Sequence, residues 1–384
     1  MKVSSRIAAV VLGSALALNA VATDLKIGFI SSMSGPVSAL GIPYAKGVQA
    51  AIALQPEVAG RKVQLILLDD ASDPSTAARN ARKLVTEDKV DLLIGTSGVP
   101  GAMAIAAVAR ETKTPLISPT PVNPPPDDGG WTVTVSQPFP LMVAAVVERM
   151  KKSGVKTVAF IGFSDALGDL AYDSLVKAAE PAGIKVVTNE RYGRSDTSVA
   201  GQVLKIVAAR PDAVFTGTSG SPGALPYLAL AERGYRGQLY GTHGLINADF
   251  VRVGGAAVEG LMVPSGPVMV ADQLGADNPV RKVALDYRAA YQRTHGAAPV
   301  DAFSAYTFDA WLVFADAAAR ALKSSKAEPG TPELRSALKD AIASTRELPG
   351  THGVFSFQPN NAYGLDKRSA VVIKLEKGQW KLVP

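Results

Sequence analysis

Short apolar runs alternate with amphipathic stretches along most of the chain. A run rich in Val, Ile and Leu predicts a strand, and apolar residues at helical spacing predict a helix. In the first part of the chain the predicted strands are residues 25–30, 63–68, 92–94 and 115–117, and the predicted helices are residues 43–54, 74–87 and 100–110. Asp73 and Pro74 are typical of the cap and first position of the second of these helices.

A second series of the same kind follows a loop over residues 119–130, which holds five prolines and two glycines. Here the predicted strands are residues 157–161, 185–190, 213–216 and 238–240, and the predicted helices are residues 141–152, 167–179, 198–209 and 222–233. Strands that alternate with helices form parallel sheets covered on both faces. The two series therefore predict two α/β lobes.

The last third of the chain is less regular. Three further helices are predicted, at residues 280–294, 302–322 and 332–344. The end of the chain is predicted to form antiparallel strands at residues 353–357 and 370–382, with Asn360, Asn361 and Gly364 in the connection. No short repeat of the kind that builds solenoids is found.

The first 22 residues have the pattern of a secretory signal peptide. Lys2 and Arg6 give a positive start, residues 7–18 form an apolar run, and residues 20–22 are a small-x-small cleavage site. We therefore expect cleavage after Ala22 and location in the periplasm. The apolar run is shorter than a membrane span, and no later stretch reaches about 18 uninterrupted apolar residues.

Composition agrees with an exported two-lobed protein. A mature chain of about 360 residues exceeds one ordinary core. At 47% hydrophobic and 19% charged residues, the chain has material for two cores. Loss of the leader lowers the formal net charge from +6 to +4, and without a basic run nucleic acid is not an expected partner. The chain has no cysteine for disulfides, metal ligation or a lipid anchor, which favours a freely diffusing protein.

Motifs of catalysis and cofactor binding are absent from the sequence. There is no phosphate-binding loop and no G-x-G-x-x-G between a strand and a helix. The segments at residues 95–98 and 217–220 follow strands but lack the second glycine of a hydrolase elbow. His243, His295 and His352 are far apart in sequence and lack clustered carboxylates. We expect neither an enzyme nor a cofactor nor a metal site.

The predicted strand ends carry the candidate binding residues. In open parallel sheets ligands bind beyond the carboxyl ends of the strands, where helix N-termini offer free N–H groups. These segments are rich in small hydroxyl residues, with one acid, Asp165, and one histidine, His243; they are residues 31–36, 96–99, 118–120, 163–165, 218–220 and 242–244. They predict a hydrogen-bonding cleft for a carboxylate, although helix caps and turns explain any single residue equally well.

Motifs in these segments resemble those of the branched-chain amino-acid-binding proteins of ABC transporters, which have the type I periplasmic binding fold. The motifs are Ile27-Gly28, Met33-Ser34-Gly35-Pro36 and Gly41 at the start, Leu93-Ile94-Gly95 and residues 115–119 in the first lobe, and residues 162–168, 217–220 and Tyr240-Gly241 in the second. The resemblance extends over essentially all of the mature chain, and the order and spacing of the motifs are its most specific aspect.

The resemblance implies a particular architecture: two doubly wound parallel-sheet α/β lobes, joined by a three-stranded hinge, that close around a ligand. The chain would cross near residues 137–138, 264–267 and 349–350. Lobe 1 would then comprise residues 23–137 and 265–349, and lobe 2 residues 138–264 and 350–384. The implied partner is the membrane permease of an ABC transporter, with the chain acting as a monomer. A periplasmic sensor subunit of the same fold is the alternative, but no kinase or receptor membrane segment accompanies it.

The resemblance also implies site residues. In the first lobe, residues that hold the ligand's α-carboxylate fall on Ser97, Gly98, Val99, Ser118 and Thr120. In the second lobe, the acid that pairs with an amino acid's ammonium is replaced by His243, and two tyrosines of the family are replaced by Leu167 and by Ser219 or Gly220. An aromatic residue near the first-lobe rim is replaced by Leu40. Asp165 is a further candidate, either for a ligand hydroxyl or for an Asx turn. Phe303 and Tyr306 are expected to pack in the core near the hinge.

These departures change the expected ligand. A buried ammonium without a carboxylate partner is costly, and His243 would repel it when protonated. The smaller side chains leave space for a ring. We therefore expect an aromatic acid or a keto acid, such as benzoylformate, phenylpyruvate or a benzoate derivative. A branched-chain or other hydrophobic amino acid is the alternative.

Overall fold

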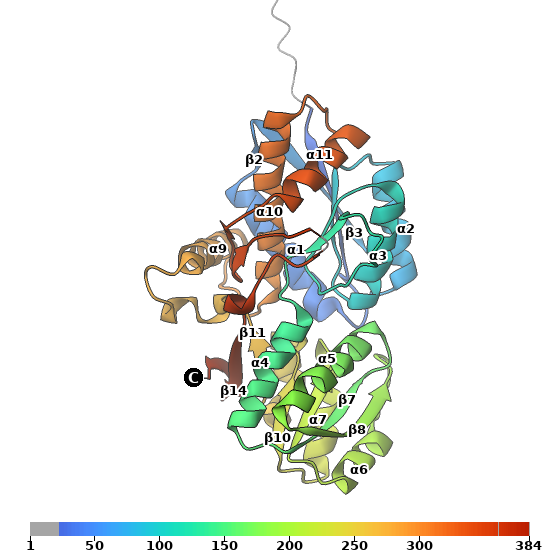
Figure 1. Ribbon diagram of the computed structural model, residues 1–384, viewed down its shortest axis with the longest axis vertical. Helices are drawn as coiled ribbons and strands as arrows, with labels where there is room; N and C mark the ends of the chain where they lie inside the picture. The colour runs from blue at the N-terminus through green and yellow to red at the C-terminus, as the bar shows by residue number, and fades with distance from the viewer. Residues whose placement is uncertain (1–22, 360, 384) are drawn as a thin grey trace, which may run out of the picture.

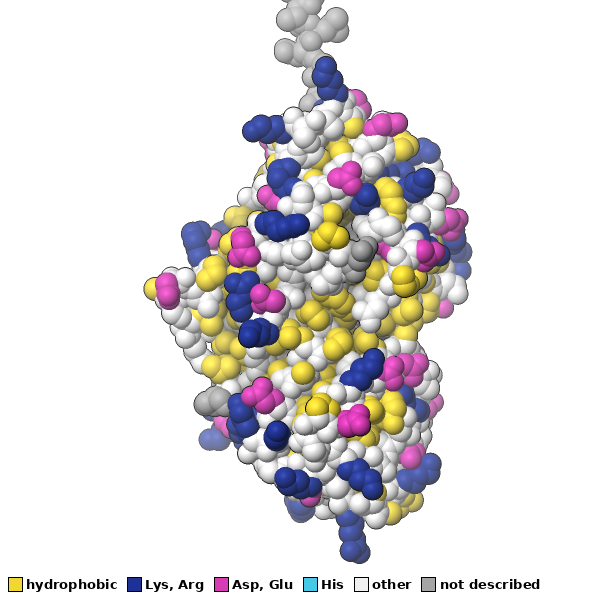
Figure 2. All heavy atoms as spheres, in the orientation of Figure 1, with side chains coloured by type: hydrophobic (Ala, Val, Ile, Leu, Met, Phe, Trp, Pro, Cys, Tyr) yellow, Lys and Arg dark blue, Asp and Glu magenta, His cyan; other side chains and the backbone are white. Residues whose placement is uncertain are grey.

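The structure is a computed structural model that describes residues 23–359 and 361–383, so the predicted leader lies outside the described residues. The chain folds into two lobes, one above the other in Figure 1, each built on a mainly parallel sheet with helices packed against it. This confirms the predicted fold class. In Figure 2 charged side chains are spread over both lobes, whereas hydrophobic ones gather at the level where the lobes meet.

The first lobe contains a six-stranded sheet in the order β2-β3-β1-β4-β5-β6, in which β2 pairs antiparallel with β3 and all other neighbours are parallel. Its strands are β1 (Leu25–Ser31), β2 (Glu57–Val58), β3 (Arg61–Asp69), β4 (Leu92–Gly95), β5 (Leu116–Ser118) and β6 (Thr132–Thr134). One of its cores contains residues of α2 (Pro74–Thr86) and α3 (Val99–Thr112). A larger core contains residues of α1 (Ser38–Leu54), α9 (Pro279–His295), α10 (Phe303–Ser324) and α11 (Pro332–Ala343).

The second lobe contains a seven-stranded sheet in the order β15-β14-β11-β10-β9-β7-β8, in which β14 pairs antiparallel with both neighbours. Its strands are β7 (Thr157–Phe163), β8 (Lys185–Tyr192), β9 (Ala213–Gly217), β10 (Gln238–Gly241), β11 (Met262–Ser265), β14 (Val371–Glu376) and β15 (Gln379–Leu382). Its helices are α4 (Phe139–Lys152), α5 (Ala166–Ala182), α6 (Ala200–Ala208), α7 (Leu225–Glu232) and α8 (Ala248–Gly254), with 3-10 turns η1 (Ser221–Ala224), η2 (His243–Leu245), η3 (Gly255–Val258) and η5 (Lys367–Ser369).

The chain passes between the lobes three times. The first passage lies between β6 and α4, and the second between β11 and the 3-10 turn η4 (Pro267–Gln273). The third falls later than residues 349–350, because Phe355, Phe357 and Leu365 pack in the larger core of the first lobe. We therefore propose a lobe division in which the first lobe extends to about residue 365.

The C-terminal strands also differ from their prediction. The strand β13 (Val354–Phe355) pairs with β12 (Leu348–Pro349) beside the first lobe, whereas β14 belongs to the sheet of the second. The two predicted strands are thus not partners of one another. The antiparallel partner of β14 at the end of the chain is β15, across a turn at Lys377 and Gly378.

Candidate functional site

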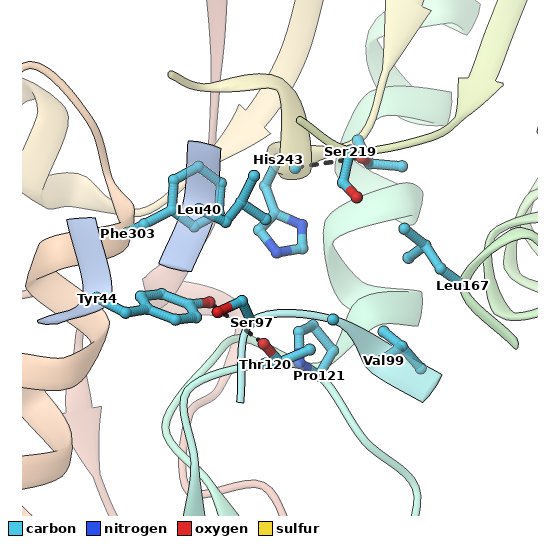
Figure 3. Close-up of a pocket in the computed structure, with 13 residues that line it drawn as sticks. Leu40, Tyr44, Ser97, Val99, Thr120, Pro121, Leu167, Ser219, His243 and Phe303 are labelled. Atoms are coloured by element: carbon cyan, nitrogen blue, oxygen red, sulfur yellow. Dashed lines mark hydrogen bonds between the residues drawn. The ribbon is translucent and has the colours of Figure 1, made fainter. Parts of the chain in front are cut away.

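A pocket of about 320 Å³ lies between the lobes, at the carboxyl ends of strands from both sheets (Figure 3). The first lobe contributes residues that follow β4 and β5, together with α1 and α10, and the second contributes the start of α5 and the turns after β9 and β10. The lining residues are Leu40, Tyr44, Ser97, Gly98, Val99, Thr120, Pro121, Leu167, Ser219, Thr242, His243, Gly244 and Phe303. None of these residues is an Asp, Glu, Lys or Arg.

The hydroxyls of the first-lobe wall use their hydrogens inside the protein. Thr120 donates to the Thr96 carbonyl at 2.6 Å. Ser97 accepts from the Ser32 backbone N–H at 3.0 Å. Ser97 also lies 3.0 Å from the Ser31 hydroxyl, whose own hydrogen goes to the Gly41 carbonyl, so Ser97 is the donor of that pair. These side chains fix the shape of the wall rather than offering donors to a ligand.

The donors left at the first-lobe wall are the backbone N–H groups of Val99 and Gly101 at the start of α3, since Pro100 between them has none. Gly98 is the N-cap residue of α3, and no side chain caps this helix. By contrast, α5 begins at the opposite wall with its first N–H groups bound to Asp165, which accepts from Leu167 and Gly168 at 2.9 and 3.2 Å. An uncapped helix N-terminus favours an anion. The start of α3 is therefore the better place for a carboxylate.

His243 is the central polar side chain of the second-lobe wall. Its ring lies among those of Phe139, Phe303 and Tyr306, with centroid distances of 5.9, 6.4 and 6.2 Å. It is 6% exposed, and its Nδ1 has no hydrogen-bond partner in the described part of the chain. Burial, with a smaller effect of His352, lowers the pKa of His243 to about 3. The imidazole is thus neutral at ordinary pH, with hydrogen-bonding capacity that the protein leaves unused.

Two other hydroxyls lie on the second-lobe wall. Thr242 donates to the Thr218 carbonyl and accepts from the Gly244 N–H at 3.2 Å, so it is internally satisfied. Ser219 accepts a hydrogen bond from Arg194 Nη1 at 3.1 Å. The 3-10 turn η2, which contains His243, packs closely against the turn after β9: the Gly220 N–H donates to the Gly244 carbonyl at 2.9 Å, and a Cβ on Gly244 would lie only 2.6 Å from the Ser219 Cβ.

Apolar side chains close the rest of the pocket. Leu40 and Leu167 face one another from the two lobes, and Phe303 packs edge-on against Tyr44 with ring centroids 5.8 Å apart (Figure 3). Tyr44 donates to the Pro119 carbonyl at 3.1 Å, which turns its ring rather than its hydroxyl hydrogen to the pocket. The site is therefore a small apolar chamber with polar groups at two points, the start of α3 and the His243–Ser219 wall.

Eight of the ten predicted site residues line this pocket, namely Leu40, Ser97, Gly98, Val99, Thr120, Leu167, Ser219 and His243. Ser118 does not, because its fully buried hydroxyl donates to the Thr120 carbonyl at 2.7 Å. Asp165 does not either: it caps α5 and pairs with Arg194 at 2.6 Å, facing a neighbouring hollow of about 600 Å³. The Asx-turn alternative for Asp165 thus describes its hydrogen bonds.

Tyr44, Pro121 and Phe303 line the pocket without having been predicted. Phe303 was expected in the core, and its side chain does belong to the larger first-lobe core while one face closes the pocket. Its signal in the sequence was its place at the start of a helix near the hinge. Thr242 and Gly244 flank His243 in a segment that the strand-end argument had already marked.

The buried side chains of Gln137, Tyr306 and His352 connect the passages between the lobes. Gln137, on the first passage, accepts from the Tyr306 hydroxyl at 2.6 Å and donates to the Ser369 carbonyl near the third passage at 2.8 Å. His352 stacks on Tyr306 and lies 3.1 Å from the Asp309 carboxylate. The hinge network thus adjoins the site through the contact between the Tyr306 and His243 rings.

Two kinds of feature are not found among the described residues. No group of three or more His, Asp or Glu side chains is placed to hold a metal ion. In the same part of the chain, no helix has the length and apolar character needed to cross a membrane.

Two lobes joined by three passages, with a pocket between them, are the architecture of a bilobal ligand-binding protein. The periplasmic binding protein family matches residues 24–364, and the chain belongs to this family. The Leu/Ile/Val-binding protein BraC3 of Rhizobium johnstonii is 26% identical over 367 residues, which are 93% of each chain. Both the family and this relative are described as binding proteins rather than enzymes.

Solved structures agree. An extracellular ligand-binding receptor from Rhodopseudomonas palustris is 38% identical, with a TM-score of 0.91 over 94% of this chain and 100% of that chain. A solute-binding protein of an ABC transporter from R. palustris, in complex with benzoate, is 21% identical, with a TM-score of 0.76 over 94% of this chain and 95% of that chain. The second likeness is one of fold.

Proposed function

We propose that this protein is the periplasmic receptor of an ABC importer, and that it captures a small aromatic or keto carboxylate by closure of its two lobes. The observation that carries the ligand class is the His243 imidazole, which is neutral, buried and unpaired in a pocket whose lining has no charged side chain. The carboxylate is assigned to the start of α3, and a keto, hydroxyl or phenolic oxygen to the His243 wall.

An amino acid fits this pocket poorly. Its ammonium would face neutral groups only, because the nearby Asp165 carboxylate is engaged by Arg194 and by the start of α5. A buried charge without a partner costs several kcal/mol, on the order of 3–5 kcal/mol when one member of a buried pair is missing. A keto or hydroxyl oxygen at the same position accepts or donates a hydrogen bond with a neutral imidazole at no such cost.

The walls of the pocket favour a single ring. Phe303 and Tyr44 offer aromatic surfaces, and aromatic pairs contribute about 0.5–1.5 kcal/mol beyond area burial. Names of relatives leave the choice open, since one has Leu/Ile/Val-binding in its name and another was solved with benzoate. The pocket chemistry is what supports the aromatic or keto acid.

Calorimetry and thermal shift with four probes test this ligand class. Benzoate and benzoylformate should raise the melting temperature and release or absorb heat on binding, since a ligand that binds only the folded state stabilises it. Phenylglycine, which has the skeleton of benzoylformate with an ammonium in place of the keto oxygen, should bind at least tenfold more weakly. Tight binding of leucine or phenylglycine, with none of the aromatic acids, would reject the proposal in favour of an amino-acid receptor.

The transport role has a separate test. Neighbouring genes for a permease and an ATPase, and loss of uptake of the bound acid in a deletion strain, are expected for an importer. Normal uptake in that strain, with loss of a transcriptional response to the acid, would instead assign the chain to a sensor.

A further inference from the structure

Among the five hydroxyls that line the pocket, Ser219 differs from the others in where its hydrogen goes. The hydrogens of Ser97, Thr120 and Thr242 are donated to protein acceptors, and that of Tyr44 goes to the Pro119 carbonyl. Ser219 has one partner in the described part of the chain, and that partner is Arg194. A guanidinium can only donate, so Ser219 is the acceptor of this bond. Its own hydrogen remains available to the pocket.

Contacts with its surroundings hold the Arg194 guanidinium in the position from which it donates to Ser219. It follows β8, and its Nε donates to the Asp165 carboxylate at 2.6 Å. Its guanidinium lies over the Phe163 ring, 4.2 Å from the centroid. Its Nη1 then reaches Ser219 at 3.1 Å. Asp165 is itself fixed as the cap of α5, and the Phe163 ring is fully buried. The arginine therefore has little freedom to turn away from Ser219.

We infer that Arg194 is a positioning residue that makes Ser219 the hydroxyl donor of the site, so that the second-lobe wall selects a ligand presenting an oxygen acceptor to Ser219. The inference rests on the proposed function and deepens it. The acceptor is a keto, carboxylate or phenolate oxygen beside His243. An ammonium at this place would have to share the Ser219 oxygen with the positively charged Arg194 guanidinium, which already donates to one of its two lone pairs.

Two probes that differ at one position measure this selectivity. Benzoylformate and phenylacetate have the same ring and carboxylate, with a keto oxygen in one where the other has a methylene. Wild-type protein should bind benzoylformate about three- to tenfold more tightly, as expected for one hydrogen bond. Ser219→Ala should remove most of this ratio because it removes the donor.

Arg194→Met is the decisive variant. The Ser219 hydroxyl then loses the bond that fixes its direction, and the benzoylformate to phenylacetate ratio should fall towards that of Ser219→Ala. The double variant should lose no more than either single variant, because both remove the same interaction. Arg191→Met is the matched control: Arg191 lies near the end of β8, binds the Phe163 carbonyl and Asp169, and lines neither cavity.

The outcomes separate the inference from the proposed function. A wild-type ratio that is unchanged in Arg194→Met, in protein that still binds phenylacetate normally, would overturn the role of Arg194 and leave the ligand class intact. Additive losses in the double variant would also overturn it. Wild-type protein that binds neither acid would remove the proposed function and the inference together. Binding of phenylacetate also reports folding, since a merely destabilised variant loses affinity for both acids equally.

Discussion

Tyr306 and His352 lie face to face, with ring centroids 3.7 Å apart and planes 5° from parallel. Both are fully buried, and their stacking links the contacts of Tyr306 with those of His352 in the hinge. On one side the Tyr306 ring meets His243 in the pocket. On the other, the His352 backbone and ring bind the Asp309 carboxylate. The hinge network thus contacts the ligand site through His243, and changes in one are expected to reach the other.

Gly266→Ala should weaken both folding and ligand binding. A Cβ at this position on the second passage would lie 2.2 Å from His352 Cδ2 and 2.7 Å from Gln137 Nε2, and both neighbours are held by other contacts. Overpacking of this kind costs about 1–3 kcal/mol of unfolding free energy. Urea unfolding measures it. Gly201→Ala in α6, where no atom lies within 4 Å of the new Cβ, is the control and should be neutral or slightly stabilising. Equal effects of the two substitutions would contradict the packing argument.

His243→Glu should shift the ligand preference towards amino acids. The carboxylate would supply the partner that an ammonium lacks, so the affinity ratio of phenylglycine to benzoylformate should rise at least tenfold. His243→Gln, which removes the imidazole without adding charge, should weaken benzoylformate binding without improving phenylglycine binding. Calorimetry on both variants checks the pair of expectations, and improved phenylglycine binding by the Gln variant would count against them.

Acid should lower the free energy of unfolding, because the buried His243 cannot bind a proton that the unfolded chain binds. Its pKa is about 3 in the folded state and 6.5 in the reference state, so the unfolded chain binds the extra proton between these values. This contribution is fully present well above pH 6.5 and is lost as the pH falls towards 3, by about 2 kcal/mol at pH 5 and about 4 kcal/mol at pH 3. The difference in unfolding free energy between wild type and His243→Gln should shrink accordingly from pH 7 to pH 5. A difference that stays constant would mean that His243 is not buried neutral.

Phe303→Leu should reduce the preference for a ring. The substitution keeps an apolar side chain at the pocket but removes an aromatic surface, so affinity for benzoate should fall about three- to tenfold. Phe357→Leu is the matched control, because this buried phenylalanine lies in the first-lobe core outside the pocket. If both variants lose affinity to the same degree, the effect is one of stability rather than of contact with the ligand.

The sequence predicted the elements whose signals are local. Asp73 caps α2 as expected, accepting from Thr76 at 2.7 Å. By contrast α1 begins at Ser38, five residues before its predicted start, because Pro43, a residue typical of the first position, lies inside the helix. The strands β6 and β11 were missed because β6 has a single apolar residue, Val133, between two threonines, and β11 contains Pro264, which is disfavoured within a strand.

The site was predictable as a set of segments but not as a set of hydrogen bonds. Strand ends and the family resemblance placed Ser97, Thr120 and His243 at the pocket. Which hydroxyl has a free hydrogen depends on partners far away in sequence, such as Ser31 for Ser97 and Arg194 for Ser219. Asp165 was open to two interpretations for the same reason, since only the fold shows that Arg194 and the start of α5 use its oxygens.

The pairing of β14 with β11 has a consequence for the order of folding. Met262 is opposite Lys374 in this antiparallel ladder, and β15 adds to the same edge. One edge of the second sheet is therefore built from residues near the end of the chain, while its middle strands come from residues 157–241. During synthesis neither lobe has all of its parts until nearly the whole polypeptide exists. The second sheet is therefore completed only after its last two strands have been synthesised. Removal of the last fifteen or so residues should expose β11 as an unpaired edge strand that is prone to aggregate.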